Sequence, residues 1–291
     1  MNSEHIVSKG QLFASTRLFW VFLAVLSGIV AIPEFALSCV SAGTARTVAQ
    51  TVAASPEKDF SATVAALAAA SPDDSATIEK LEKKAFAFLD SVVLGDLDGH
   101  DRPDLDSINA QLLKLASREE SSGENYQVLS IGGKPNAYAL TADFGFGAPS
   151  AIRLYSEQGN NAHFVLAGEI DRFSFKDMLD DSLQLLLVPV APPAAESVFV
   201  TVGGRMDELR TGEFSAWRFD GKELKRLWSS DLVSHSTYKV SLGGFALTYC
   251  KDPDDQDAKA CRRMVRETYS YSSPDGQWRQ VSSEPVVGPA R

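Results

Sequence analysis

The spacing of apolar residues changes along the chain and divides it into regions. Residues 18–32 form one continuous apolar run. In residues 77–95 and 104–117 apolar residues recur at helical spacing, which predicts two helices. From residue 126 onward apolar and polar residues alternate, as they do in strands that bury one face.

Twelve short segments of this alternating pattern predict strands, and turn residues such as Asp220-Gly221 separate them. So many short strands predict a mainly β domain. The predicted strands are residues 126–131, 136–141, 151–155, 163–167, 183–188, 197–202, 214–219, 224–228, 238–242, 245–249, 265–271 and 278–281.

The β region also contains similar hairpins. Residues 150–155 resemble residues 215–220, and a glycine turn and a further apolar strand follow each of them. Residues 269–278 repeat the order of aromatic strand, glycine turn and strand. We therefore expect repetitive antiparallel four-stranded units behind a short helix pair, arranged like propeller blades, as a twisted array or as a sandwich.

Composition and pattern together predict four regions. Residues 1–42 are predicted to be a signal peptide. Residues 43–76, rich in Ala, Ser and Thr, are predicted to be a linker with some helical tendency. Residues 77–118 form the helical pair, and residues 126–287 form the β-rich domain.

The apolar run near the N-terminus predicts export. A membrane-spanning helix needs about 20 apolar residues, so this run is short for one, and it follows Lys9 and Arg17 as in a signal peptide. Val40-Ser41-Ala42 resembles a cleavage site. Two alternatives stay open: Ala36-Leu37-Ser38-Cys39 resembles a lipobox in which Cys39 would be acylated, or the run stays uncleaved as an anchor.

The cysteines indicate the cellular compartment of the protein, and its net charge limits the classes of binding partner. Cys250 and Cys261 flank a polar, turn-rich segment, and a disulfide between them would stabilise the fold by about 2–3 kcal/mol. Such bonds persist in oxidising compartments, so we expect a periplasmic or extracellular protein; two free thiols are the alternative. The net charge of −10 argues against nucleic acid and against docking on anionic lipid. Membrane contact would then come only through an uncleaved or lipidated N-terminus.

An Asp-rich stretch joins the two predicted helices. Asp96, Asp98, Asp101 and Asp104 resemble the calcium loops of secreted FG-GAP/VCBS-type propeller repeats, over about ten residues of the chain. The resemblance implies a calcium site, but Asp101 stands where the repeat has glycine. The alternative is that Asp101 or Asp104 caps the second helix. No other cofactor is expected.

No catalytic signature is present in the sequence: it has no Gly-x-Ser-x-Gly motif and no histidine pair at zinc-ligand spacing. A carboxylate pair for glycoside hydrolysis would have to come from Asp143, Glu169, Asp171, Asp180, Asp181, Asp207 and Glu208. The aromatic residues of the β region could form a sugar- or peptide-binding face or fill the core; they are Tyr155, Trp217, Phe219, Trp228, Tyr249, Tyr269, Tyr271 and Trp278.

These patterns predict an exported, non-catalytic binding or scaffolding protein of the cell envelope, with a protein or carbohydrate ligand. One alternative is an exported hydrolase that uses carboxylates. The other is a lipoprotein-type assembly factor, which an exposed apolar stripe on residues 78–93 would indicate.

Overall fold

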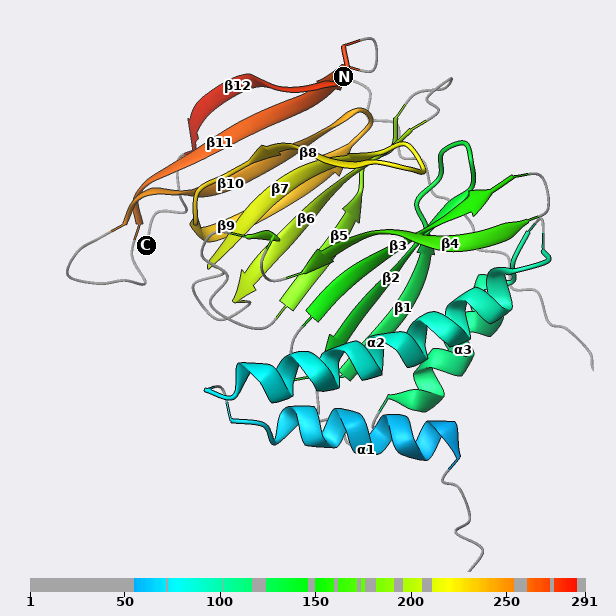
Figure 1. The fold of residues 1–291 in the computed structure, drawn as a ribbon. Helices are drawn as coiled ribbons and strands as arrows, with labels where there is room; N and C mark the ends of the chain where they lie inside the picture. Colours follow the sequence, from blue (N-terminus) through cyan, green and yellow to red (C-terminus); the bar gives the residue numbers. More distant parts are fainter. Residues whose placement is uncertain are drawn as a thin grey trace, which may run out of the picture. The chain divides into compact units, whose positions relative to one another are not determined.

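The computed structural model describes residues within one of the two compact units of the chain, Val52–Arg291 (Figure 1). The predicted signal peptide, its cleavage site and Cys39 lie outside the described residues. The described residues are 55–71, 73–100, 102–116, 124–145, 150–159, 162–171, 174–175, 182–190, 196–205, 211–253, 261–272 and 275–286.

The first helix, α1 (Pro56–Ala68), lies inside the region predicted to be a linker. Ser55 caps it by accepting a hydrogen bond from the Lys58 amide, and Pro56 occupies the first turn, where a missing amide proton costs nothing. Its buried residues recur at helical spacing: Phe60, Thr63, Val64 and Leu67. The sequence indicated some helical tendency in this region, and the structure shows a capped helix with a buried apolar face.

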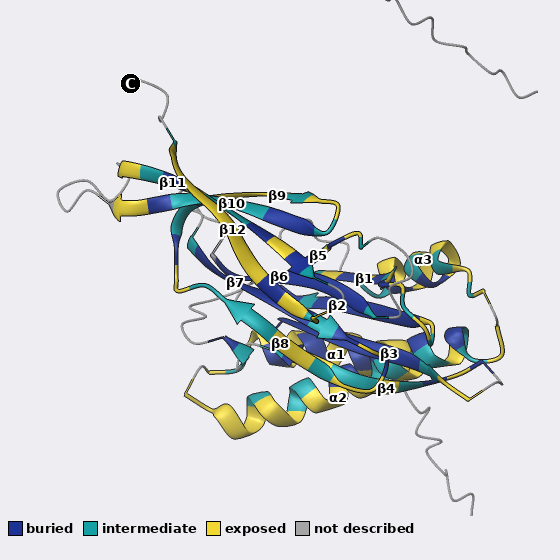
Figure 2. Cartoon of the chain, turned by 90° about the horizontal axis from the view of Figure 1, so that it is seen from above, coloured by how far each residue is buried: buried dark blue, intermediate teal, exposed yellow. Residues whose placement is uncertain are grey.

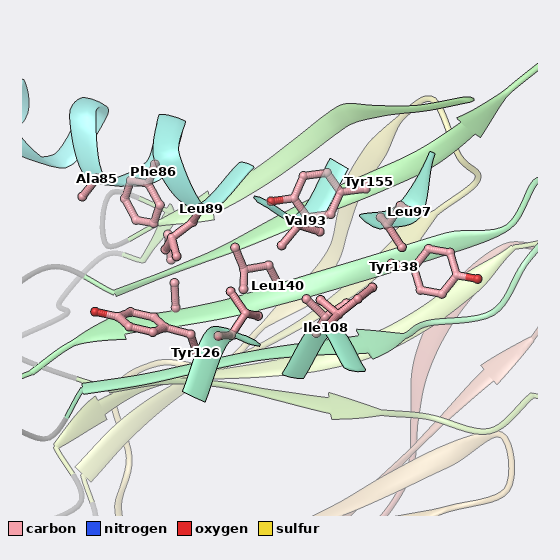
Figure 3. Packing of buried hydrophobic residues seen from close by; sticks show 14 of the residues in the cluster. Ala85, Phe86, Leu89, Val93, Leu97, Ile108, Tyr126, Tyr138, Leu140 and Tyr155 are labelled. Atoms are coloured by element: carbon pink, nitrogen blue, oxygen red, sulfur yellow. The ribbon is translucent and has the colours of Figure 1, made fainter. Parts of the chain in front are cut away.

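Helices α2 (Ser75–Leu97) and α3 (Leu105–Leu115) match the predicted pair. The apolar side of α2 is packed inside the molecule: Leu89 and Val93 are fully buried. Figure 3 shows these side chains packed with Leu140 and Tyr155 of the neighbouring sheet. The exposed apolar stripe expected of an assembly factor on residues 78–93 is therefore not found on this helix.

The strands form three separate antiparallel sheets of four strands each, with neighbours in chain order. The prediction of repetitive antiparallel four-stranded units is confirmed, and the sheets do not close into a barrel. Sheet A contains β1 (Glu124–Ser130), β2 (Ala137–Phe144), β3 (Ser150–Gln158) and β4 (His163–Asp171); sheet B contains β5 (Ser182–Leu187), β6 (Ser197–Arg205), β7 (Thr211–Phe219) and β8 (Leu224–Ser229); sheet C contains β9 (Ser234–Ser241), β10 (Gly244–Pro253), β11 (Cys261–Ser272) and β12 (Gln277–Val286).

Three hydrophobic clusters hold four layers together (Figure 1). The first joins the helices to sheet A and contains Leu89 and Leu140. The second joins sheet A to sheet B and contains Leu154 and Phe199. The third joins sheet B to sheet C, around Phe245. The order of the layers is thus helices, sheet A, sheet B and sheet C.

The position of a strand in this stack explains its burial pattern. Sheets A and B are covered on both faces, so β3 is buried at every residue from Ser150 to Ser156 and β7 is buried almost throughout. Sheet C is covered by sheet B on one face only. Its edge strand β12 is mostly exposed, with Trp278 as its one buried residue (Figure 2).

Candidate functional site

The Asp-rich stretch fixes the ends of helices. Asp104 caps α3 by accepting a hydrogen bond from the Ser107 amide at 3.2 Å, as the capping alternative predicts. Asp98 ends α2 and accepts a hydrogen bond from the Phe164 amide at 2.7 Å, and its other oxygen lies 3.1 Å from Nδ1 of His163. The carboxylate of Asp98 therefore ties the end of α2 to the start of β4.

The structure offers little for the predicted calcium loop. Asp96 belongs to the last turn of α2, and Asp101 lies outside the described residues. Over the described ranges, no group of three or more His, Cys, Asp or Glu side chains could hold a metal ion.

The two cysteines of the β region are joined. Cys250 on β10 and Cys261 at the start of β11 form a disulfide, with their Cα atoms 5.8 Å apart. Cys250 is buried, and next to it the pairing of β10 with both of its neighbours is irregular. The disulfide thus fixes the end of the β10–β11 hairpin where the regular ladder breaks down.

A first pocket, of about 380 Å³, lies between α2 and sheet A, and we call it the helix pocket. Arg153 of β3 is buried at its base and donates two hydrogen bonds to Asp90 of α2, at 2.7 Å and 2.6 Å. Tyr155 donates a third to the same carboxylate at 2.7 Å. Arg153 also contacts Glu169 of β4 at 2.9 Å, and its guanidinium lies over the ring of Phe86.

In the helix pocket Arg153 is paired with two carboxylates. Burial by itself would lower the pKa of Arg153, but its hydrogen bonds to Asp90 and the charges of Asp90 and Glu169 outweigh burial and raise it. Arg153 therefore stays a cation between two carboxylates. This is the chemistry of a structural link between layers.

Of the carboxylates considered for hydrolysis, Glu169 and Asp171 both line the helix pocket, and Asp143 does not. Glu169 pairs with Arg153, and Asp171 accepts hydrogen bonds from the amide and hydroxyl of Ser174. Asp143 accepts a hydrogen bond from the Gly145 amide, and burial raises its pKa. The remaining candidates lie outside the described residues: Asp180, Asp181, Asp207 and Glu208.

A second pocket, of about 510 Å³, lies between sheets B and C, and we call it the B–C pocket. Its walls combine aromatic rings, hydroxyl groups and two carboxylates, and Lys251 stands with them. The lining residues are Thr211, Trp228, Ser229, Ser230, Asp231, Leu232, Val233, Ser234, Leu247, Tyr249, Cys250, Lys251, Glu267 and Tyr269.

Glu267 occupies an unusual place in this pocket. Residues paired across a strand ladder share a face, and Glu267 pairs with Leu247, which is almost fully buried. Val265 and Tyr269 lie two positions before and after it on β11, so they share its face, and both are buried. The Glu267 carboxylate therefore lies on the face of sheet C that packs against sheet B. It is partly exposed and lines the pocket.

Two tyrosine hydroxyls form hydrogen bonds with the Glu267 carboxylate. Tyr269 donates a hydrogen bond to Glu267 at 2.6 Å. Burial raises the pKa of Tyr249, and the charge of Glu267, a hydrogen bond with it and the charge of Asp231 raise it further. The pKa of Tyr269 is raised by burial and then by the hydrogen bond and charge of Glu267. Both hydroxyls thus stay protonated and able to donate.

Asp231 reaches the same pocket from a loop that is held at two points. Ser230 exchanges two hydrogen bonds with the backbone of Phe214, at 2.8 Å and 2.9 Å. Val233 exchanges two backbone hydrogen bonds with Gly212, at 2.9 Å and 3.0 Å. Because both ends are fastened to β7, the exposed Asp231 and Leu232 are presented at the mouth of the pocket.

The aromatic residues divide between the two roles predicted for them. Most fill the core, since Tyr155, Trp217, Phe219, Tyr269, Tyr271 and Trp278 are buried. Trp228 and Tyr249 are only partly buried, and both line the B–C pocket. The sequence reasoning named these aromatics but missed Glu267 and Asp231.

None of the described helices is long and apolar enough to cross a membrane. Comparison of the chain with protein-family models, with curated proteins and with solved structures finds no match, so the case for a function rests on the geometry of the B–C pocket.

Proposed function

We propose that this chain is an exported, non-catalytic binding protein of the cell envelope that holds its ligand in the B–C pocket. The observation that carries the proposal is the set of partly exposed side chains that two neighbouring sheets and a fastened loop direct into one pocket: Trp228, Tyr249, Glu267 and Asp231. Sites built on rigid elements bind with less loss of conformational entropy than sites on free loops.

The size and chemistry of the pocket suit a small ligand or one projecting group of a larger one. A volume of about 510 Å³ lies within the range usual for small-molecule sites. Partly exposed rings offer large apolar contact area, and the carboxylates and serine hydroxyls offer hydrogen bonds. A sugar unit or a side chain of a partner protein would use both.

Export is supported by the N-terminal apolar run and by the disulfide, because such bonds persist in oxidising compartments. The test is the intact mass of the protein recovered from the envelope of an expressing host, with and without reductant and alkylation. A chain that begins at Gly43 and gains two thiols only on reduction would support export and cleavage. A chain that begins at an acylated Cys39 would support a lipoprotein, and an uncut chain with free thiols would contradict the proposal.

The pocket itself is tested by NMR of the tryptophan indole groups. Trp228 lines the pocket, whereas Trp217 and Trp278 are buried in the core and do not. A Trp228→Phe variant assigns the Trp228 signal. A library of sugars, amines and short peptides that binds in the pocket should shift the Trp228 signal and leave the Trp217 and Trp278 signals in place. A library that shifts none of the signals would contradict the proposal.

A further inference from the structure

The charges around the B–C pocket are left unbalanced by the protein. Among the described residues, no Lys, Arg or His forms an ion pair with Glu267 or Asp231. Lys251 lines the same pocket, so two carboxylates face one ammonium group. The pocket therefore carries a net negative charge.

Partial burial makes the missing counter-charge of Glu267 energetically costly. A carboxylate on the packed face of a sheet loses part of its hydration, and that loss is costly unless hydrogen bonds or an opposite charge replace it. Tyr269 and Tyr249 each supply one hydrogen bond to Glu267. Hydroxyl groups donate one hydrogen bond each, and a carboxylate can accept about four. Glu267 thus retains capacity to accept from a donor that enters the pocket.

The ring chemistry favours the same kind of ligand. The faces of aromatic rings carry partial negative charge and attract organic cations, with tryptophan the strongest of them. Trp228 and Tyr249 are partly exposed in the pocket. An anionic ligand would meet two carboxylates and the rings, and a neutral sugar would leave both carboxylates without a counter-charge.

We infer that the B–C pocket selects small organic ligands that carry an ammonium group, with Glu267 as the deep partner of that group and Asp231 as its partner at the mouth. This inference rests on the proposed function and names the ligand class of the same pocket. Amino sugars and quaternary ammonium compounds share this chemistry, and calorimetry with glucosamine and choline separates them.

The test compares glucosamine with glucose, which differ by one amino group, and adds choline as a quaternary ammonium probe. Binding to the full chain is measured by calorimetry in mildly acidic, low-salt buffer, where the amine of glucosamine carries a proton. We expect glucosamine, choline or both to bind at least about tenfold more tightly than glucose, a difference typical of one charge-assisted contact. Added salt should weaken the binding. Glucosamine without choline would indicate a primary ammonium that donates hydrogen bonds, and the reverse would indicate recognition by the rings.

Variants separate this inference from the proposed function. Glu267→Gln should lose about tenfold or more in affinity for the cation. Glu169→Gln, a matched change at a carboxylate that pairs with Arg153, should lose none. If glucose binds as tightly as glucosamine and still shifts the Trp228 indole signal, the inference fails and the proposed function stands. If Glu267→Gln is folded and binds the cation as tightly as the unchanged protein, the inference also fails. If no probe binds and the library shifts no indole signal, both fail.

Discussion

Two layer junctions each hold a tyrosine–carboxylate pair beside a pocket, and an arginine pairs with only one of the two carboxylates. In the helix pocket Tyr155 donates to Asp90 at 2.7 Å, and in the B–C pocket Tyr269 donates to Glu267 at 2.6 Å. Arg153 neutralises the first carboxylate, and no described cation pairs with the second. The same tyrosine–carboxylate pair is therefore part of a completed internal bond in one place and an incomplete site in the other. The difference shows that Asp90 is paired with a cation, whereas Glu267 has only hydrogen bonds from tyrosine among the described residues.

The largest effect is expected when the cation that pairs with Asp90 is removed. Arg153→Met leaves Asp90 partly buried without its partner, and we expect the free energy of unfolding to fall by about 3–5 kcal/mol. Urea unfolding measures the change. Lys84→Met is the control, because its ion pair with Asp59 is exposed and should contribute at most about 1 kcal/mol. Equal losses in the two variants would show that Arg153 does not neutralise a buried charge.

The next largest effect is expected at the disulfide beside the B–C pocket. Replacing both Cys250 and Cys261 with serine should lower the free energy of unfolding by about 2–3 kcal/mol, because the open chain gains conformational freedom when unfolded. Urea unfolding with and without reductant measures this. The unchanged protein should lose a similar amount on reduction, and the double variant should be insensitive to reductant. A double variant as stable as the oxidised protein would contradict this role for the bond.

Alkaline pH probes the motif that the two junctions share. Burial and a neighbouring carboxylate raise the pKa of Tyr155 and of Tyr269 in the folded protein, while the unfolded chain ionises near about 10. The folded state thus holds protons that the unfolded state loses, so stability is full below about pH 10 and falls above it, by up to about 1.4 kcal/mol per pH unit for each tyrosine. Tyr269→Phe and Tyr155→Phe should each make this fall shallower when urea unfolding is repeated across that range. An unchanged slope in both variants would contradict the raised values.

The smallest effect sharpens the comparison most. Glu267→Gln keeps an acceptor for the Tyr269 hydroxyl and removes a charge that has no described counter-ion, so we expect stability to change by less than about 1 kcal/mol. Thermal or urea unfolding measures it. A loss as large as that of Arg153→Met would show that Glu267 is a structural residue, and the contrast between the junctions would disappear.

Much of the fold was predictable because its signals are local. Each of the twelve predicted strands overlaps an observed strand, since alternation of apolar and polar residues is visible within a few positions. The stacking of sheets was less visible. In β3 and β7 burial on both faces follows from which layers cover them, and that depends on contacts between residues far apart in the chain. For helix α1 the sequence indicated only a helical tendency, because its buried face is short.

The candidate site was only partly predictable. The spacing of Val265, Glu267, Tyr269 and Tyr271 places Glu267 on the same face as three apolar residues, so its inward position could have been recognised from the sequence. Asp231 could not, because its position depends on the bonds between its loop and β7. The absence of a described counter-ion for either carboxylate is likewise a property of the assembled layers.

The outer position of β12 has a consequence for self-association. Because the sheets stack without closing, sheet C ends in a strand whose outer edge pairs with no other strand among the described residues. Such an edge can template pairing between copies and so promote aggregation. Here Pro285 removes one backbone donor, and Arg279 and Glu284 are exposed charges on the same strand. At high local concentration the side chains of this last strand would thus protect the protein from edge-to-edge fibre growth.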